Sequence, residues 1–266
     1  MRMMERTTIM LCIKLFLFTA SAGAMLIQRR KITHTQSQQQ TTQTLRAAEV
    51  STISSLRKEY SSQGLEIDHN MQEKGPFDLF SIWLDEACKA NVIEPNAMCL
   101  STCLNNRPSA RYVLLKGYDT RGFVWYTNYN SRKSDEAMAS GFAALTFWWG
   151  DLERSVRIEG EVEKVSEEES DAYFNSRPRG SQIGAWSSNQ SSKISSREDL
   201  EQQEKDIIAR FESETEIVPR PPHWGGFRLV PDRMEFWKGR QSRLHDRIVF
   251  EREDDVSPWT TVRLQP

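Results

Sequence analysis

The sequence predicts a mainly β protein of the α+β class, in which helices flank a barrel or sandwich of strands. Five runs of alternating apolar residues, separated by turn residues, follow one another within about seventy residues, and similar runs occupy the C-terminal part of the chain. Helical periodicity is confined to segments before, between and after these runs. The sequence has no internal repeat and no glycine-rich dinucleotide motif, which disfavours a doubly wound sheet.

The first predicted element of the fold is a helix that begins at Pro76. Phe77, Phe80, Trp83 and Ala87 recur at three- and four-residue spacing and form one apolar stripe. Proline is favoured in the first turn of a helix because its missing N–H would be unpaired there anyway. This helix should therefore pack on the sheet.

The strands follow the helix, and each alternates apolar and polar residues or is apolar throughout. The first five predicted strands are residues 97–103, 110–117, 122–128, 142–149 and 154–165. Two helices should follow, one opened by the capping box of Ser166 and Glu169 and the other by Ser195 and Glu198. The last four predicted strands are residues 225–230, 233–239, 246–251 and 259–264.

Bulk composition excludes some functions. The 266 residues include 38% hydrophobic residues, enough for a normal core. A formal net charge of -2, with both signs mixed along the chain, argues against nucleic-acid binding by bulk electrostatics, so any phosphate site must be local. The four cysteines form no CxxC pair, so we expect no metal site and a reducing compartment, with Cys99 and Cys103 as small core residues.

The N-terminal region differs from the rest of the chain. Residues 1–31 combine basic residues, an apolar run too short for a stable membrane span, and small residues typical of cleavage sites. They form a possible targeting segment, either secretory or organellar, unless translation starts further along the chain. Residues 32–55 are polar and should form a flexible linker. A single domain should span 56–266; its location should be cytoplasmic, with mitochondrial or other targeting as the alternative.

Basic residues stand out in the first half of the domain. Arg111 should open a strand and Lys116 should end it, on opposite faces of that strand. Arg132 and Lys133 follow Ser131, a combination that can bind a phosphate but that also fits an exposed basic turn.

A second group lies near the end of a predicted helix. Tyr173, Arg177 and Ser181 are spaced so that a phenol, a guanidinium and a hydroxyl could reach one anion, although Arg177 could equally stabilise the helix end. Gln190 and Ser191 lie in a polar segment suited either to ligand contacts or to a surface loop.

A third group lies near the C-terminus. Arg243, His245 and Arg247 alternate, so on a strand they would project from one face. Three neighbouring cations repel one another unless an anion or an electron-rich ring lies opposite. The pattern therefore favours a ligand site over a structural histidine.

Together these motifs resemble the pyridoxine/pyridoxamine 5′-phosphate oxidase family. The resemblance extends from Leu56 to Pro266 through the motifs LRKEY, PNAMCLST, PSARYVLLKG, YTNYNSRK, VRIEGEVEKV, YFNSRPRGSQIGAWSSNQSS, HWGG, MEFWKGRQSRLHDRI and RLQP. It implies an FMN-binding split β-barrel that works as a homodimer, with each flavin between two subunits. It also implies oxidation of pyridoxine and pyridoxamine 5′-phosphates to pyridoxal 5′-phosphate by O2, which yields H2O2, and NH3 from the amine. Such a chain would be a pyridoxal 5′-phosphate synthase of vitamin B6 metabolism.

The resemblance also implies roles for individual residues. The residues matching flavin contacts are Arg111, Tyr112, Val113, Leu114, Tyr126, Thr127, Arg132, Lys133, Ser155, Arg157, Gln190, Ser191, Trp237 and Arg247. The residues matching the clamp on the substrate phosphate are Lys116, Tyr173, Arg177 and Ser181. Arg243 and His245 match the catalytic pair over the pyridine ring, and Arg57 and Tyr60 match a segment that closes over the site.

Two departures from the family pattern leave an alternative open. Ser155 stands where the family usually has a glutamine, which predicts weaker flavin binding. The segment after Phe250 is shorter than in relatives, and the last strand carries Thr260, Thr261 and Val262. The alternative is a non-catalytic protein of the same fold that binds flavin or pyridoxal phosphate.

Overall fold

The computed structural model describes Leu56 and residues 59–60, 74–211 and 217–266 of the chain. The chain divides into two compact units, residues 1–58 and 59–266, and of the first unit only Leu56 is described. The predictions for residues 1–31 and 32–55 and for Arg57 therefore lie outside the described residues. Within the described ranges, no helix is long and apolar enough to cross a membrane.

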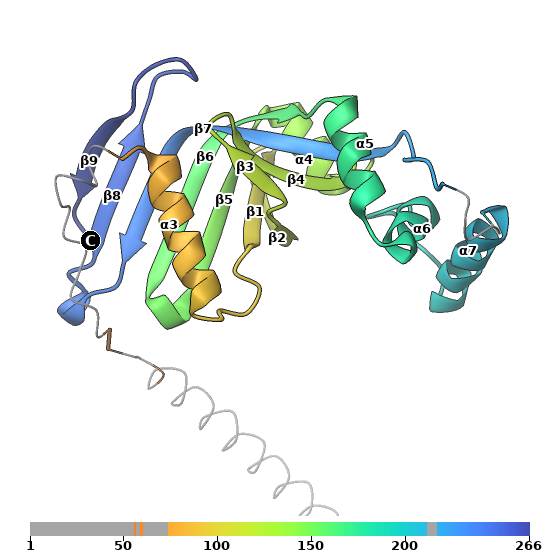
Figure 1. The fold of residues 1–266 in the computed structure, drawn as a ribbon, viewed down its shortest axis with the longest axis horizontal. Coiled ribbons are helices and arrows are strands. Elements are labelled where there is room, and N and C mark those ends of the chain that lie inside the picture. The colour runs from red at the N-terminus through yellow and green to blue at the C-terminus, as the bar shows by residue number, and fades with distance from the viewer. Residues whose placement is uncertain (1–55, 57–58, 61–73, 212–216) are drawn as a thin grey trace, which may run out of the picture. The chain divides into compact units, whose positions relative to one another are not determined.

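The second unit is built on a nine-stranded antiparallel sheet (Figure 1). Seven strands form the order β2-β1-β5-β6-β7-β4-β3, while β8 pairs with β7 and β9 pairs with β8. The strands are β1 (Ala97–Leu104), β2 (Arg107–Leu114), β3 (Gly117–Asp119), β4 (Gly122–Asn128), β5 (Phe142–Trp149), β6 (Arg154–Lys164), β7 (Trp224–Lys238), β8 (Asp246–Glu251) and β9 (Thr260–Leu264).

The sheet divides at β7, a single strand of 15 residues where the sequence predicted two. Its first half pairs with β4 and its second half with β8, while β6 pairs along its length. Pro231 interrupts the alternating pattern, but a shift of register opposite Gly160 accommodates it. A Cβ at Gly160 would lie only 2.0 Å from the carbonyl oxygen of Val230, so a side chain there would prevent this close pairing.

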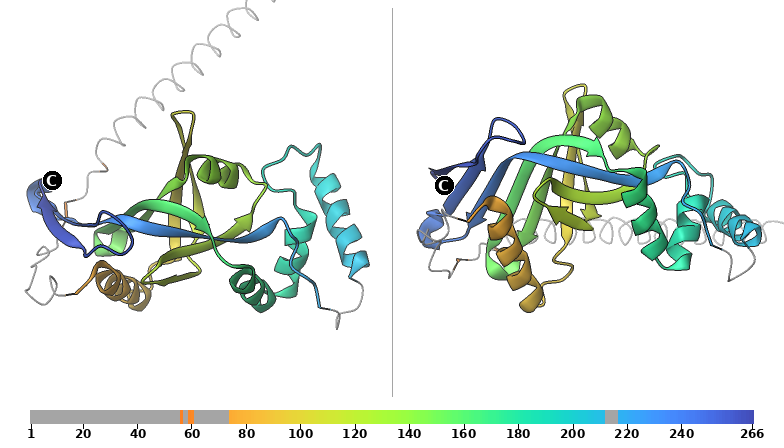
Figure 2. Two further views of the ribbon diagram at one scale, coloured as in Figure 1. Left: turned by 90° about the horizontal axis from the view of Figure 1, so that it is seen from above. Right: turned by 45° about the horizontal axis from the view of Figure 1, so that its top comes forward.

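Five α-helices are described: α3 (Pro76–Lys89), α4 (Arg132–Ser140), α5 (Glu167–Ser176), α6 (Arg179–Ser187) and α7 (Arg197–Arg210). The predicted stripe of α3 packs on the sheet, where Phe80 and Trp83 are buried with Phe147 and Phe236 of the strands. The helices α5, α6 and α7 lie near the start of β7 (Figures 1 and 2). A second, smaller core there contains Phe174, Ile183 and Trp224.

Several predicted boundaries were wrong. The helices α4 and α6 have no counterpart among the predicted elements, and α7 is capped by Ser196 rather than Ser195. The strand β2 begins at Arg107, because Asn105 and Asn106 adopt the left-handed conformation of a tight two-residue hairpin. Arg111 therefore lies within the strand, and Lys116 lies beyond its end.

The structure also tests the expectations for two cysteines and for the last strand. Cys103 is exposed and Cys99 only partly buried, so the prediction that both are core residues was wrong. The last strand forms despite its unusual residues, since β9 pairs with β8 from Thr260 to Leu264.

Candidate functional site

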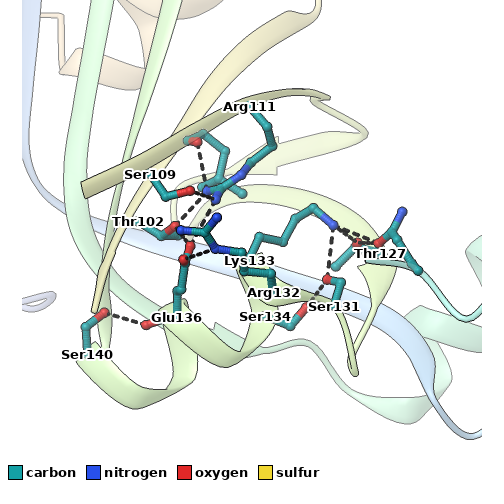
Figure 3. A network of polar contacts seen from close by, with 12 residues as sticks. Thr102, Ser109, Arg111, Thr127, Ser131, Arg132, Lys133, Ser134, Glu136 and Ser140 are labelled. Atoms are coloured by element: carbon teal, nitrogen blue, oxygen red, sulfur yellow. Dashed lines mark hydrogen bonds and ion pairs between the residues drawn. The ribbon is translucent and has the colours of Figure 1, made fainter. Parts of the chain in front are cut away.

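The first part of the candidate site is a basic cluster around α4, made of Arg111, Arg132 and Lys133 (Figure 3). The Lys133 ammonium donates hydrogen bonds to the side-chain oxygens of Thr127, at 2.9 Å, and Gln190, at 2.7 Å. A third bond reaches the Ser131 hydroxyl at 3.0 Å. Four of the predicted flavin contacts, Arg132, Lys133, Thr127 and Gln190, therefore lie together, with the last supplied by the segment after α6.

Arg111 is held by a buried carboxylate that the sequence analysis did not identify. Its Nη2 lies 2.9 Å from Oε2 of Glu136, which also accepts a hydrogen bond from Thr102. The other oxygen of Glu136 lies 2.7 Å from Nε of Arg132. Glu136 thus fixes both arginines, although it also takes up part of their charge.

Burial and neighbouring charge change the pKa values of this cluster. Burial, together with the positive charge of Arg111, lowers the pKa of Lys133 to about 8. Burial disfavours the ionised form of Glu136, but hydrogen bonds from Thr102 and the two arginines outweigh it and lower the pKa of that carboxyl. At neutral pH the cluster therefore retains a net positive charge, and a cavity of about 530 Å³ lined by Arg132 and Ser191 adjoins it.

The second part is an aromatic clamp formed by Tyr126, Tyr173, Trp224 and Arg177. The rings of Tyr126 and Tyr173 stack with centroids 4.0 Å apart, and that of Trp224 lies nearly parallel to both. The Arg177 guanidinium carbon lies 4.6 Å from the Trp224 ring centroid. The predicted proximity of Tyr173 and Arg177 is therefore present, but Arg177 is the C-cap of α5 rather than part of it.

Arg177 has a buried nitrogen, Nη1, with no hydrogen-bond partner among the described residues. Burial also lowers the pKa of this arginine. A buried, unpaired donor is costly, and such an atom commonly marks a place where a ligand or water completes the site. Ser181 lies in the first turn of α6, close in sequence, whereas no hydrogen bond or ion pair in the described part of the chain joins the exposed Lys116 to the clamp.

The third part surrounds His245. Its ring packs 4.7 Å from that of Trp237 and 5.4 Å from that of Tyr60, measured between centroids. The backbone N–H of Arg240 donates to Nδ1 at 3.1 Å, which leaves the proton of the neutral ring on Nε2. Burial and the charge of Arg243 lower the pKa of His245, so the neutral form dominates at pH 7.

The predicted alternation of Arg243, His245 and Arg247 along a strand was wrong. Residues 241–243 form a short 3-10 turn in which Ser242 and Arg243 have positive φ, and β8 begins only at Asp246. Arg243 is exposed beside His245, whereas Arg247 is on the strand. Arg243 remains close enough to lower the pKa of His245, so the expected repulsion persists between these two side chains.

Arg247 binds a second buried carboxylate that the sequence analysis also missed. Its Nε and Nη2 contact the two oxygens of Glu235 at 2.8 and 2.9 Å, and Arg157 lies 3.6 Å from the same carboxylate. Glu235 is 3% exposed, and the hydrogen bond and charge of Arg247 overcome burial to lower the pKa of the carboxyl. Glu235 lies two residues before Trp237, so strand alternation places both side chains on the same face of β7. This spacing could have identified Glu235 from the sequence.

The remaining predicted flavin residues are distributed over both faces of the sheet. Tyr112 and Leu114 are exposed, and alternation along β2 places them on the opposite face from Arg111 and Val113. The Ser155 hydroxyl donates to the carbonyl oxygen of Phe147 at 2.9 Å, so this donor is already used within the sheet.

The aromatic clamp and the His245 group lie at opposite ends of β7. Trp224 begins the strand and Trp237 is its penultimate residue, thirteen positions later. At about 3.3 Å per residue this corresponds to roughly 40 Å along the strand. One chain therefore cannot bring both groups to the same small molecule.

Comparison with known protein families gives two matches that together cover most of the second unit. Residues 84–211 match the family described as pyridoxamine 5′-phosphate oxidase. Residues 224–266 match the pyridoxine 5′-phosphate oxidase C-terminal dimerisation region.

Curated relatives agree with these matches. The pyridoxine/pyridoxamine 5′-phosphate oxidase of Rubrobacter xylanophilus is 53% identical over 215 residues, 80% of this chain and 96% of the relative. The enzyme of the same name from Nostoc punctiforme is 51% identical over 219 residues, 81% of this chain and 99% of the relative.

Solved structures confirm the predicted mainly β split barrel with flanking helices. PhzG from Burkholderia lata, solved with tetrahydrophenazine-1-carboxylic acid, has a TM-score of 0.70 and 31% identity, and the match covers 78% of this chain and all of that one. An FMN-binding protein from Nostoc punctiforme shares the fold, with a TM-score of 0.58 at 16% identity over 73% of this chain and 99% of that one.

Proposed function

Since the chain belongs to the pyridoxamine 5′-phosphate oxidase family, we propose that it oxidises pyridoxine and pyridoxamine 5′-phosphates to pyridoxal 5′-phosphate with FMN and O2. As a member of this family the chain is an oxidoreductase whose cofactor is FMN. It carries the family's C-terminal dimerisation region and forms a homodimer.

The observation that carries the proposal is the environment of Lys133. A partly buried ammonium is surrounded by hydroxyl and amide oxygens, and no carboxylate pairs with it in the described part of the chain. Such a cation can neutralise a ligand phosphate without first breaking an ion pair. Together with Arg111 and Arg132, it fits the phosphate of FMN, while Trp237 and Arg247 would contact the flavin ring.

The distance along β7 supports a site shared between two subunits. We assign the phosphate clamp of Tyr173, Arg177, Ser181 and the more distant Lys116 to one subunit of each site. The pair Arg243 and His245, with Tyr60, then comes from the other subunit. This arrangement explains why the homodimer would be required for activity.

The residues of the chain would act mainly by orienting the substrate. The clamp fixes the phosphate, and the binding energy of that remote group holds the reacting carbon in place. His245, neutral and with its proton on Nε2, can donate a hydrogen bond to the substrate, while Arg243 balances the charge on the pyridine ring as electrons leave. FMN supplies a two-electron acceptor that O2 reoxidises to give H2O2. With pyridoxamine 5′-phosphate, water completes the balance and NH3 is released.

Purified protein tests this proposal directly. A yellow dimer that consumes O2 and forms equal amounts of H2O2 and pyridoxal 5′-phosphate from pyridoxamine 5′-phosphate is the expected result. Bound flavin or pyridoxal phosphate without turnover would instead establish the non-catalytic alternative.

The catalytic pair has its own test. His245→Ala or Arg243→Ala should lower turnover about 100-fold, a size typical of lost orientation, while FMN content stays near that of the wild type. Loss of flavin with an unchanged rate per bound flavin would remove both residues from this role.

We propose a cytoplasmic location, with organellar targeting by residues 1–31 as the alternative. Mass spectrometry of the N-terminus of the protein from its native cell distinguishes them, because a cleaved targeting segment would be missing.

A further inference from the structure

Arg177 is a partly buried arginine that contacts aromatic rings. Its guanidinium lies over the ring of Trp224 and within 5.7 Å of the ring centroid of Phe174. No ion pair to a carboxylate involves Arg177 in the described ranges. By contrast, the buried Arg228 and the nearby Arg220 are both paired with carboxylates of α5, those of Glu169 and Asp171.

Contact with a ring face leaves the guanidinium of Arg177 able to bind an anion. A ring face attracts a guanidinium through its quadrupole and leaves the N–H groups in the guanidinium plane free. A carboxylate would occupy those N–H groups and cancel the charge. Nη1 of Arg177, buried and unpaired, is such a free donor.

Trp224 is held firmly enough to serve as a fixed support. Its carbonyl oxygen accepts a hydrogen bond from Arg220 at 2.7 Å, and Arg220 also binds Asp171 of α5. The two residues after Trp224 are glycines, and a Cβ on Gly226 would lie 2.8 Å from the ring of Tyr126. The backbone after Trp224 can therefore pack directly against the ring of Tyr126.

We infer that Trp224 is a positioning residue for the substrate phosphate. Its indole face holds Arg177 at the end of α5 with the charge uncompensated, so that the phosphate of the substrate becomes the counter-ion. The inference rests on the proposed function, which assigns Arg177 to the phosphate clamp.

Binding to the FMN-loaded enzyme tests this role apart from turnover. Trp224→Leu should weaken binding of pyridoxal 5′-phosphate and of inorganic phosphate about tenfold, the size of a partly desolvated cation–π contact, and leave binding of unphosphorylated pyridoxal unchanged. Trp224→Phe keeps an aromatic face and should recover most of the affinity. In steady-state assays the loss should appear in KM rather than kcat.

Trp186 provides a matched control. It also lies beneath an arginine, with the guanidinium carbon of Arg210 4.8 Å from its ring centroid, but among the described residues no cation–π contact joins it to Arg177. Trp186→Phe and Trp186→Leu should leave phosphate binding unchanged.

Three results would overturn the inference. The first is a Trp224→Leu enzyme that keeps its FMN and binds pyridoxal 5′-phosphate as the wild type does. The second is an equal loss of affinity for pyridoxal and its phosphate, which would indicate general distortion. The third is a Trp224→Phe enzyme no better than Trp224→Leu. If phosphate binding depends on Trp224 but the wild-type protein does not turn over its substrate, the proposed oxidase activity is contradicted and this inference stands.

Discussion

Arg177 and Arg247 are both partly buried arginines assigned to ligand binding, yet the protein holds them by different means. Arg247 makes a bidentate contact with the buried carboxylate of Glu235, whereas Arg177 lies on the ring of Trp224. The first arrangement fixes the guanidinium and cancels its charge. The second fixes it less strictly and preserves the charge.

The difference matches what each ligand would need. A flavin ring is neutral in its oxidised form and requires a precisely placed hydrogen-bond donor, which a carboxylate-bound arginine can provide. A substrate phosphate carries negative charge and requires a cation without a competing anion. The type of attachment therefore distinguishes positioning arginines from charge-neutralising ones, and three experiments test this distinction.

Removal of the Glu235 carboxylate should have the largest effect. Glu235→Ala would leave Arg157, Arg233 and Arg247 without their shared buried partner, which should cost about 3–5 kcal/mol of unfolding free energy. Urea unfolding of the apoprotein measures this loss.

A matched control for Glu235 is available on the neighbouring strand. Glu251 pairs with Arg233 at 3.0 Å but is 48% exposed, so Glu251→Ala should cost less than about 1 kcal/mol. Equal losses for the two variants would contradict the view that burial makes Glu235 structurally important.

Removal of the ring-bound arginine should affect substrate binding more than stability. Arg177→Ala deletes a cation that has no charged partner in the described part of the chain, so no buried charge is left uncompensated. We expect KM for pyridoxamine 5′-phosphate to rise about 30-fold, a loss of about 2 kcal/mol typical of charged hydrogen bonds, with similar kcat.

Steady-state kinetics and thermal unfolding together decide this prediction. Arg210→Ala, which removes the arginine over Trp186, should change neither KM nor kcat. If Arg177→Ala lost as much unfolding free energy as Glu235→Ala, the proposed distinction between ring-bound and carboxylate-bound arginines would be contradicted.

The smallest effect concerns Lys133, whose partners are neutral oxygens. Its pKa of about 8 in the apoprotein means that the cation is lost as pH rises through that value. A bound phosphate favours the protonated form, so the Kd of FMN should change little between pH 6.5 and 7 and rise above pH 8 by at most about tenfold per pH unit.

Flavin fluorescence quenching between pH 6.5 and 9.5 measures this profile. Lys133→Arg keeps its charge over the whole range and should remove the rise, whereas Lys133→Met should bind weakly at every pH. A rise that persists in Lys133→Arg would place the titrating group elsewhere.

The regular elements of the fold were largely predictable from the sequence. Alternation identified β5 and β6 with the observed bounds to within one residue, and the apolar stripe identified α3. The helix α4 was missed because it has no apolar stripe of its own, although Ser131 before it and Gly141 after it are typical helix boundaries. The continuity of β7 through Pro231 depends on Gly160 of another strand, which local patterns cannot reveal.

The candidate site was predictable only in part, for a similar reason. Ligand-facing cations stand out in a sequence, but their supports do not. Glu136 lies 25 residues from Arg111, and Trp224 lies far along the chain from Arg177. The positive φ of Ser242 and Arg243 breaks the strand geometry that the alternating cations suggested, and neither residue type signals such a turn.

The length of β7 has a genetic consequence. If each site takes its phosphate clamp from one subunit and His245 from the other, an Arg177→Ala allele and a His245→Ala allele damage different halves of it. At substrate concentrations well below KM both single variants are nearly inactive. Random mixing of the two chains would give half mixed dimers, each with one undamaged site, and so restore about a quarter of wild-type activity. Two loss-of-function alleles of this gene could thus complement each other within a single cell.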